Sequence, residues 1–483
     1  MNFSWALFID LGVISAALVL ATLIRAKVRF FQRYLIPNAL TAGFILLPLY
    51  NFVFPQLGIS SAGLGELAYH LLSISFVAMA LRKAPPGGTR GDKRIFATSV
   101  AVLSQYALQA ALGLLLTLLF IMTIVPQLYH SFGFLLPLGF VLGPGQAFAI
   151  GSGWEVSGIA GAGSVGLTFA ALGFIVSCFG GVFLINYGIK RGWLERRYVD
   201  VLNEQGVKSG VYARDAARPV GSNLTTETEA IDSMTFNTAI VLLVYFAAYL
   251  FLQTVTAALS LIGPLGQELA VNLWGISFIF ASLIGLLFKA IFFGLKIEYI
   301  LDNATLNRIS GLSVDIMVTS AIAAISLVVV SRLIVPILVL SAVGTVLAGL
   351  TVPWICSRIF RDHQFHRMLI VFGVSTGTLS TGLALLRVID PDFETPVASD
   401  YAYASGITFV LAIPFILSIN LPVRAYITGN MFFFWLAVAV SCGYLLFVAI
   451  SYILLSKHRA FAKPTKVWFG QAADAADAGR QSA

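Results

Sequence analysis

The densest group of side chains that could do chemistry is a run of hydroxyls within an apolar stretch. The run comprises Ser375, Thr376, Thr378, Ser380 and Thr381, with Gly377 and Gly382 among them. Hydroxyl and freed carbonyl oxygens suit a hard cation such as Na⁺, whereas freed N–H groups suit a carboxylate. One such hydroxyl would ordinarily bond back to its own helix. So dense a run favours a binding site. We assign ion contacts to Ser375, Thr376 and Gly377. We assign substrate contacts to Thr378, Ser380 and Thr381.

Arg387 closes this segment and is the most informative single residue. An arginine at membrane depth is costly unless it is paired or near water. Its planar guanidinium can hold a substrate carboxylate through two hydrogen bonds. It can equally reach the interface or pair with a following acid. Those acids are Asp390, Asp392, Glu394 and Asp400. The sequence favours neither interpretation.

A second segment rich in glycine and proline runs from Phe132 to Glu155 and contains Gly143-Pro-Gly-Gln146. Gly145 and Gln146 are candidates for substrate contacts, since the Gln146 amide can bond a polar ligand. Gly143 and Glu155 are candidates for ion contacts. Glu155 can also simply mark the return of the chain to the interface, and this alternative is slightly favoured.

Asp315 is the remaining candidate ion ligand, because an acid inside a predicted span is a functional candidate by default. It can equally pair with Arg308, seven residues earlier. The five histidines and three cysteines show no metal-ligand spacing. We therefore expect no metal and no cofactor, with Na⁺ only as a coupling ion. A nucleophile–base pair is also missing, so an enzyme is not predicted.

The elements that position these residues follow from composition. The chain has 483 residues, of which 58% are hydrophobic and 11% charged. A soluble protein carries about 25% charged residues, so soluble and nucleic-acid-binding classes are excluded and the bilayer is the expected environment. Spans of about 20 apolar residues cross a membrane. We predict an all-α polytopic protein with spans at 5–24, 36–54, 67–82, 95–124, 164–188, 234–258, 269–289, 309–330, 333–357, 401–422 and 432–455.

Two segments fit no single span. Ile95 to Trp154 contains no charged residue and is too long for one crossing, and its second half is broken by glycine and proline. Residues 368–388 have the same character. Irregular backbone at membrane depth is tolerated only inside protein or beside a cavity. We therefore predict re-entrant hairpins at about 132–155 and 368–388.

The cations predict the orientation. All 30 lysines and arginines except Arg332, Arg387 and Arg424 fall on one side of this arrangement. Basic loops face the cytoplasm, which places the N-terminus outside and the C-terminus inside the inner membrane. The net charge of +8 then reflects orientation and not an anionic partner.

The order of segments repeats across a polar stretch. Gly166-Leu-Thr-Phe169 recurs as Gly406-Ile-Thr-Phe409, and Phe174-Ile-Val-Ser177 recurs as Phe415-Ile-Leu-Ser418. Five spans per half give inverted repeats, an arrangement typical of secondary transporters. The expected units are a first repeat at 1–189, a cytoplasmic linker at 190–232, a second repeat at 233–425, an extra helix at 426–456 and a disordered tail at 457–483.

At these residues the chain resembles the sodium:glutamate symporter family. The likeness rests on Tyr34-Leu-Ile-Pro37, on the first hairpin with the glycine-rich Gly166 segment, and on Gly377 to Pro391, which resembles a divergent branch. It covers roughly residues 5–425 in arrangement. The resemblance implies Na⁺-driven glutamate uptake, ten core helices, two re-entrant hairpins and a homodimer. Well-known members carry Gly-His-Gly or Gly-His-Cys-Gly in the hairpins. Here no histidine stands in either place, which leaves the exact substrate open.

The leading hypothesis is a sodium-coupled symporter of glutamate or a related carboxylate, working by elevator-like alternating access. Its expected partners are a small anion, Na⁺, the bilayer and a second copy of the chain. The alternative is a passive channel or exporter for a small anion, distinguished by flux without coupling. A scaffold or receptor is disfavoured, because the soluble parts are too small for a folded reader domain.

Overall fold

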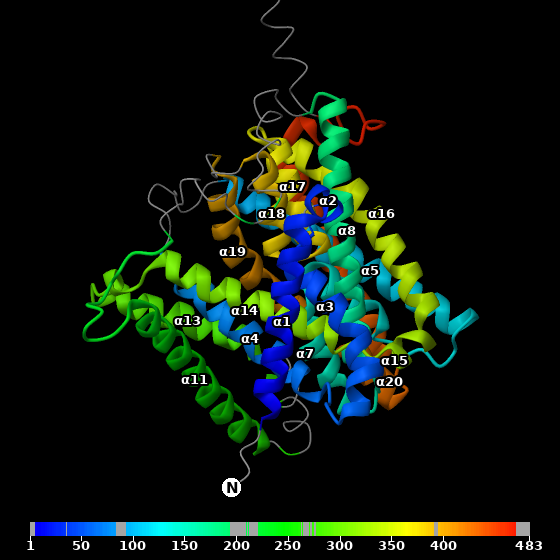
Figure 1. Cartoon of the computed structure of the whole chain (residues 1–483). Coiled ribbons are helices and arrows are strands. Elements are labelled where there is room, and N and C mark those ends of the chain that lie inside the picture. The colour runs from blue at the N-terminus through cyan, green and yellow to red at the C-terminus, as the bar shows by residue number, and fades with distance from the viewer. Residues whose placement is uncertain are drawn as a thin grey trace, which may run out of the picture.

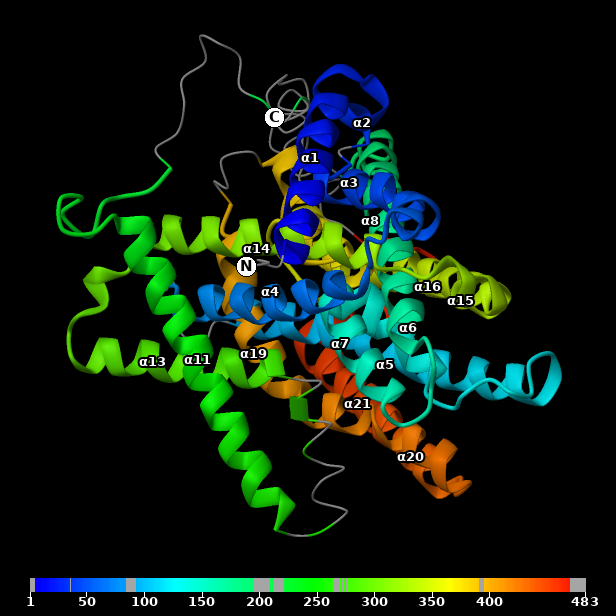
Figure 2. The ribbon, with the colours of Figure 1, turned by 60° about the horizontal axis from the view of Figure 1, so that its bottom comes forward.

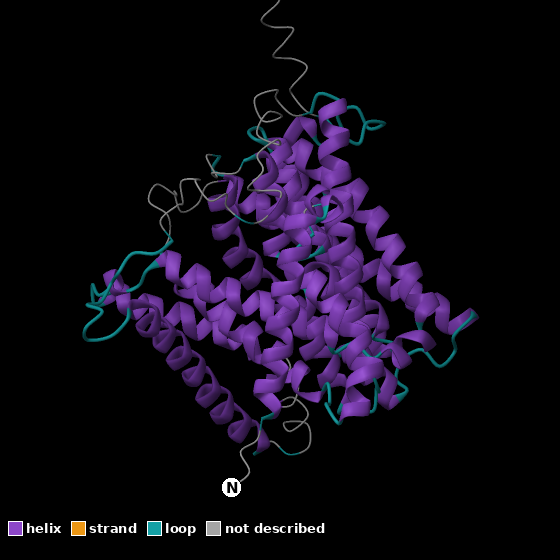
Figure 3. Ribbon diagram, viewed as in Figure 1, coloured by secondary structure: helices purple, strands orange, loops and turns teal. Residues whose placement is uncertain are grey.

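The computed structural model of the chain describes residues 5–34, 36–83, 93–193, 221–261, 277–390 and 395–469, with 209, 211, 263, 270, 273 and 274 besides. The side chains of Ser380 and Ala402 are also outside this description. Within it, every regular element is a helix (Figure 3). Ten of these helices are long and apolar enough to cross a bilayer. The prediction of an all-α, multi-pass membrane protein is confirmed at this level.

The predicted span at 309–330 is not among those ten and is corrected. It is divided between α14 (Asn303–Ala323) and α15 (Leu327–Arg332). The Asn51 side chain holds the break between them, donating to the Ile325 carbonyl at 2.9 Å and accepting from the Leu327 N–H at 3.0 Å. Such a break satisfies its own backbone groups through a neighbouring side chain, so the sequence can stay apolar while the helix ends.

One set of helices packs as a unit that we call the scaffold group. Its members are α1 (Ala6–Lys27), α3 (Asn38–Pro48), α4 (Ala62–Leu81), α11 (Ser233–Ser260), α13 (Ser277–Gly294) and α14. α4 packs along α14, while α3 packs on α14 and α13 packs on α4 (Figure 1). α1 and α11 pack on α3 and α13. Fully buried Val77, Val241 and Leu306 form the apolar centre of this arrangement.

The remaining long helices form a second unit, the site group. They are α5 (Lys93–Thr123), α7 (Pro144–Glu155), α8 (Ala162–Lys190), α16 (Ile334–Ile359), α17 (Gln364–Thr376), α18 (Leu379–Ile389), α19 (Val397–Ser418) and α21 (Phe432–Ser456). α5 is central, because it contacts α16, α17, α19 and α21. Short elements connect the chain: α2 (Arg29–Arg33), η1 (Leu49–Val53), η2 (Phe54–Leu57), η3 (Phe132–Phe134), α6 (Leu135–Pro137), η4 (Leu138–Leu142), η5 (Glu298–Ile300), α20 (Leu421–Thr428) and η6 (Lys457–Arg459).

The two groups meet largely through α7, which lies against the first half of α4 (Figure 2). Glycines make this approach close. A Cβ on Gly145 of α7 would lie 2.8 Å from the Leu72 side chain of α4, and one on Gly65 of α4 would lie 2.2 Å from the Phe148 ring of α7. α18 packs instead on α17 and α8, and it has no comparable contact with α4 or α14 in the described part of the chain.

The predicted linker and the predicted tail are only partly within the described residues, and the tail differs from expectation. Most of the linker, 194–208 and 212–220, lies outside the described residues, as do 470–483 of the tail. Residues 457–469, which we expected to be disordered, are packed against the helix ends, with Arg459 and Trp468 buried. The basic and aromatic residues of this segment find partners on other helices, which a local composition argument does not anticipate.

The contact between α5 and η3 generates a prediction about packing. A Cβ on Gly113 would lie 2.3 Å from the Gly133 carbonyl oxygen, whereas one on Gly349 of α16 would meet nothing within 4 Å. Gly113→Ala is therefore expected to lower the free energy of unfolding by about 1–3 kcal/mol through overpacking. Gly349→Ala is expected to leave it unchanged or to raise it by up to about 1 kcal/mol. Thermal unfolding of both variants in the same detergent tests this, and equal shifts would contradict it.

Candidate functional site

The hydroxyl-rich segment around Gly377 is a broken helix. α17 ends at Thr376, and α18 begins at Leu379, so Gly377 and Thr378 form the break. The two half-helices fold back on each other, and a Cβ on Gly373 would lie 2.6 Å from Gly382 Cα. Glycine at both positions lets the backbones touch, which a side chain on either would prevent.

Hydroxyl groups of this segment form hydrogen bonds with its own backbone at and near the break. Thr381 Oγ1 accepts from the Thr378 N–H at 2.9 Å and lies 2.9 Å from the Gly373 carbonyl oxygen. Thr376 Oγ1 donates to the Phe372 carbonyl at 2.8 Å. Two of the predicted ligands therefore already satisfy backbone groups of their own segment. The Ser375 hydroxyl differs, since it is buried and has no hydrogen-bond partner among the described residues.

The first glycine-rich segment is also broken. η4 ends at Leu142, Gly143 takes a left-handed φ of +93°, and α7 begins at Pro144. Only glycine adopts this conformation without strain. A Cβ on Gly143 would lie 2.8 Å from Thr378 Cγ2 and 3.8 Å from the Gly377 carbonyl oxygen. The two breaks, from distant parts of the sequence, thus lie side by side and form what we call the junction.

Helix ends give the junction its electrostatic character. α7 and α18 both begin there, and the first N–H groups of a helix have no partner within it. Each N-terminus carries a partial positive charge of roughly half a unit. Two converging N-termini make a site for an anion without any charged side chain.

Gln146 is the predicted substrate contact that lies best for this role. It lies in the first turn of α7, and it is 3% exposed. In the described part of the protein its amide has no hydrogen-bond partner, although the amide of a buried glutamine normally has one. The Gln146 amide is therefore available to a ligand at the junction.

Gln109 of α5 is a site residue that the sequence analysis missed. Its Nε2 donates to the Ser375 carbonyl at 3.1 Å, while its Oε1 is buried with no partner among the described residues. α8 closes the other side, since a Cβ on Gly173 would lie 2.5 Å from the Thr376 carbonyl oxygen. Gln109 Oε1 and Ser375 Oγ are neutral oxygens at one helix end, a donor type that suits Na⁺. The available signal was the pair Gln105 and Gln109, one turn apart in a helix that has no charged residue after Arg94.

The three charged candidates do not lie at the junction. Glu155 is exposed at the end of α7, and its Oε1 accepts from the Gly163 N–H at 2.9 Å at the start of α8. Asp315 is exposed on α14 in the scaffold group and makes no hydrogen bond or ion pair to either break in the described residues. Arg387 is exposed on α18, nine residues beyond Thr378, which is about 13 Å along the helix. The Ser380 side chain lies outside the described residues.

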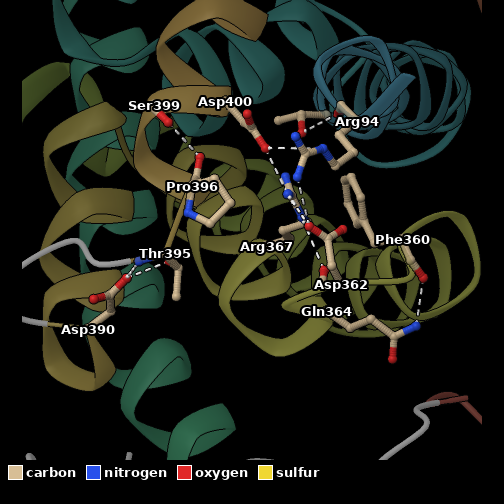
Figure 4. Close-up of polar contacts among 11 residues, drawn as sticks. Arg94, Phe360, Asp362, Gln364, Arg367, Asp390, Thr395, Pro396, Ser399 and Asp400 are labelled. Atoms are coloured by element: carbon tan, nitrogen blue, oxygen red, sulfur yellow. Dashed lines mark hydrogen bonds and ion pairs between the residues drawn. The ribbon is translucent and has the colours of Figure 1, made fainter. Parts of the chain in front are cut away.

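A partly buried charge network lies at the other end of α17 (Figure 4). Arg367 is fully buried and bonds Asp400 of α19 at 2.7 Å and Asp362 at 3.0 Å. Arg94 at the start of α5 reaches Asp362 at 3.2 Å. Burial alone would raise the pKa of Asp362, but the two guanidinium groups hold it below its usual value. The network ties α5, α17 and α19 together.

Two acids play matching structural roles after the broken segments. As Glu155 accepts from the Gly163 N–H at the start of α8, Asp390 accepts from the Thr395 N–H at 3.1 Å, two residues before α19. The Thr395 hydroxyl also donates to Asp390 (Figure 4). Each carboxylate therefore links the end of one half-helix to the start of the helix that follows it.

Comparisons with family models, with curated proteins and with solved structures found no match to this chain. The site must therefore be interpreted from its own geometry.

The charge network generates a prediction about stability. Arg367→Gln leaves buried Asp400 without its closest cation, and breaking one partner of a buried pair costs about 3–5 kcal/mol. Arg332 is exposed at the end of α15, so Arg332→Gln serves as the control with the same change of charge. Chemical unfolding should show a large loss only for Arg367→Gln. A loss of less than about 1 kcal/mol would show that the network is not a stabilising anchor.

Proposed function

We propose that the protein is a secondary active transporter that couples Na⁺ entry to uptake of a small carboxylate. The observation that carries this proposal is the junction. Two glycine-broken helices, one from each half of an apolar chain, meet through Gly143 and Thr378. Discontinuous helices of this kind bind substrate and ion in many secondary transporters.

The pattern of helix contacts supports inverted repeats. If α1, α3, α4, α5 and α8 correspond to α11, α13, α14, α16 and α19, the contacts come in matching pairs. The contact of α3 with α14 matches that of α13 with α4, and the contact of α1 with α3 matches that of α11 with α13. A pseudo-twofold axis would relate the two repeats. Across it, α4 would contact its counterpart α14, and α5 would contact its counterpart α16. The Gly166 and Gly406 motifs fall on α8 and α19, as this correspondence requires.

The ion is assigned to the end of α17. Gln109 Oε1 and Ser375 Oγ are buried oxygens that lack partners in the described residues. Burying a polar oxygen without a partner costs about 1–3 kcal/mol. A cation bound between them would recover this cost, so ion binding and closure of the site favour each other. We therefore move the ion contacts from Glu155 and Asp315 toward Gln109 and Ser375.

The carboxylate is assigned to the helix N-termini of α7 and α18, with the Gln146 amide beside it. This assignment needs no buried charge, which would be costly in the bilayer. The sequence left Arg387 equally suited to hold the carboxylate or to serve a structural role. We now favour the structural role, because Arg387 is exposed at the opposite end of α18. Glutamate or a related acid remains the proposed substrate.

Movement is supported by the unequal contacts of the two breaks. α7 packs closely on α4 of the scaffold group, whereas α18 packs on α17 and α8. With the cation-rich loops in the cytoplasm, α7 closes the outer side and α18 faces inward. We propose that the site group moves against the scaffold group, so that α18 makes the corresponding closure in the opposite state.

Uptake into proteoliposomes tests the coupling and the ion site together. Labelled glutamate should accumulate under an inward Na⁺ gradient and not when choline replaces Na⁺. Ser375→Ala removes a hydroxyl without a partner, so folding should be unaffected while the Na⁺ concentration for half-maximal uptake rises at least about tenfold. Ser177→Ala is the matched control, since that hydroxyl bonds the Gly373 carbonyl at 3.3 Å and its loss should lower stability instead.

Two outcomes would contradict this. Flux that ignores the Na⁺ gradient would favour the passive channel or exporter. Unchanged Na⁺ dependence in Ser375→Ala, with coupled uptake intact, would overturn the ion assignment alone.

The substrate assignment has its own test in a pair of variants. Gln146→Leu keeps the side-chain volume but removes the amide, so the substrate concentration for half-maximal uptake should rise by about tenfold or more. Arg387→Ala should change it by less than about threefold, because Arg387 lies outside the junction. The reverse ranking would return the carboxylate to Arg387.

A further inference from the structure

The segment that follows α21 folds back as a strap over the ends of three helices. We define the C-terminal strap as residues 457–469. Trp468 is buried and stacks on Trp193 beyond α8, with ring centroids 4.8 Å apart, and it packs edge-on against Phe365 of α17. The strap is thus held as an ordered surface at one end of the molecule.

Arg358, the next-to-last residue of α16, anchors the strap from below. Its side chain is 1% exposed, and it lies 3.4 Å from the centre of the Trp354 ring. Its guanidinium donates to four strap carbonyls, those of Ala462, Lys463, Lys466 and Val467. Every one of these acceptors is neutral.

Arg459 repeats this arrangement within the strap. Its guanidinium donates to the Ser357 carbonyl at 3.0 Å and to the Phe360 carbonyl at 3.2 Å, and it is 7% exposed. Buried cations are normally paired with carboxylates. In the described residues neither Arg358 nor Arg459 has one, so no described carboxylate offsets the positive charge beneath the strap.

The outer face of the strap adds to this charge. Lys457, Lys463 and Lys466 are exposed, and no described carboxylate lies within ion-pair distance of them. Phe461 stands among them with 69% of its surface exposed. The strap follows directly from the apolar helix α21 and is anchored on the end of apolar α16. Such helix ends lie at the level of the lipid headgroups.

We infer that the C-terminal strap binds the headgroups of anionic phospholipids in the cytoplasmic leaflet. The lysines would contact the headgroup phosphates, and the Phe461 ring would enter the acyl boundary. The buried arginines contribute an electrostatic field without direct contact. Because the strap also packs on α17 and α8, lipid binding would stabilise the base of the second broken helix.

A lipid-binding measurement tests this. Native mass spectrometry of the full chain in detergent, with added phosphatidylglycerol or phosphatidylcholine, should show at least tenfold tighter binding of phosphatidylglycerol. The triple variant Lys457→Gln, Lys463→Gln, Lys466→Gln should lose this preference, since each surface lysine contributes roughly a fivefold effect. All three side chains are exposed, so the variant should fold normally. Phe461→Ser should weaken binding of phosphatidylglycerol further.

A matched control removes equal charge from the same predicted side. Lys27 at the end of α1 and Arg29 and Arg33 of α2 are exposed, and their glutamine variants should retain the preference. Equal loss in the control would reduce the effect to net charge and overturn the site. If inorganic phosphate at the same concentration displaced phosphatidylglycerol, the strap would be a site for a soluble anion, and the lipid proposal would be overturned. If deleting residues 471–483 made phosphatidylglycerol bind tenfold more tightly, the strap cations would be partners of acids in the tail. That result would also overturn the proposed lipid site.

Discussion

Irregular backbone cannot face lipid, and the rest of the structure depends on this constraint. An unbonded N–H or carbonyl costs several kcal/mol in hydrocarbon. The two breaks at Gly143 and Gly377 are tolerated because α5 and α8 enclose them, with Gln109 bonding the Ser375 carbonyl and Ser177 bonding that of Gly373.

The site and the charges occupy different places. At the junction, polarity comes from helix ends, amides and hydroxyls, all of them neutral. The ion pairs lie instead at the base of α17, where Arg367 is held by Asp362 and Asp400. Neutral groups can bind an anion or cation and release it, whereas a buried formal charge would either repel one ligand or hold the other too firmly.

Sequence reasoning located both breaks, because glycine and proline in an apolar run leave few alternatives. It did not locate Gln109, since a glutamine in a helix can face either way until its neighbours are known. Glu155, Asp315 and Arg387 were chosen as candidates because they are charged. A charge does not reveal how far along its helix a residue lies from the break, and all three residues are exposed. The packed strap was missed for a similar reason, because its partners Arg358 and Trp193 lie far away in the chain.

The contact between Gly373 and Gly382 has a mechanical consequence. Two half-helices that touch backbone to backbone, clipped by Thr381 at the tip, behave as one stiff lever. Its tip cannot open by separating the two arms, because that would break the Thr381 bonds and expose bare backbone. Bending must therefore concentrate at the two ends of the lever. One of these ends is clamped by Arg367, and at the other end Asp390 accepts from the Thr395 N–H, so both ends of the lever are tied to neighbouring parts of the chain.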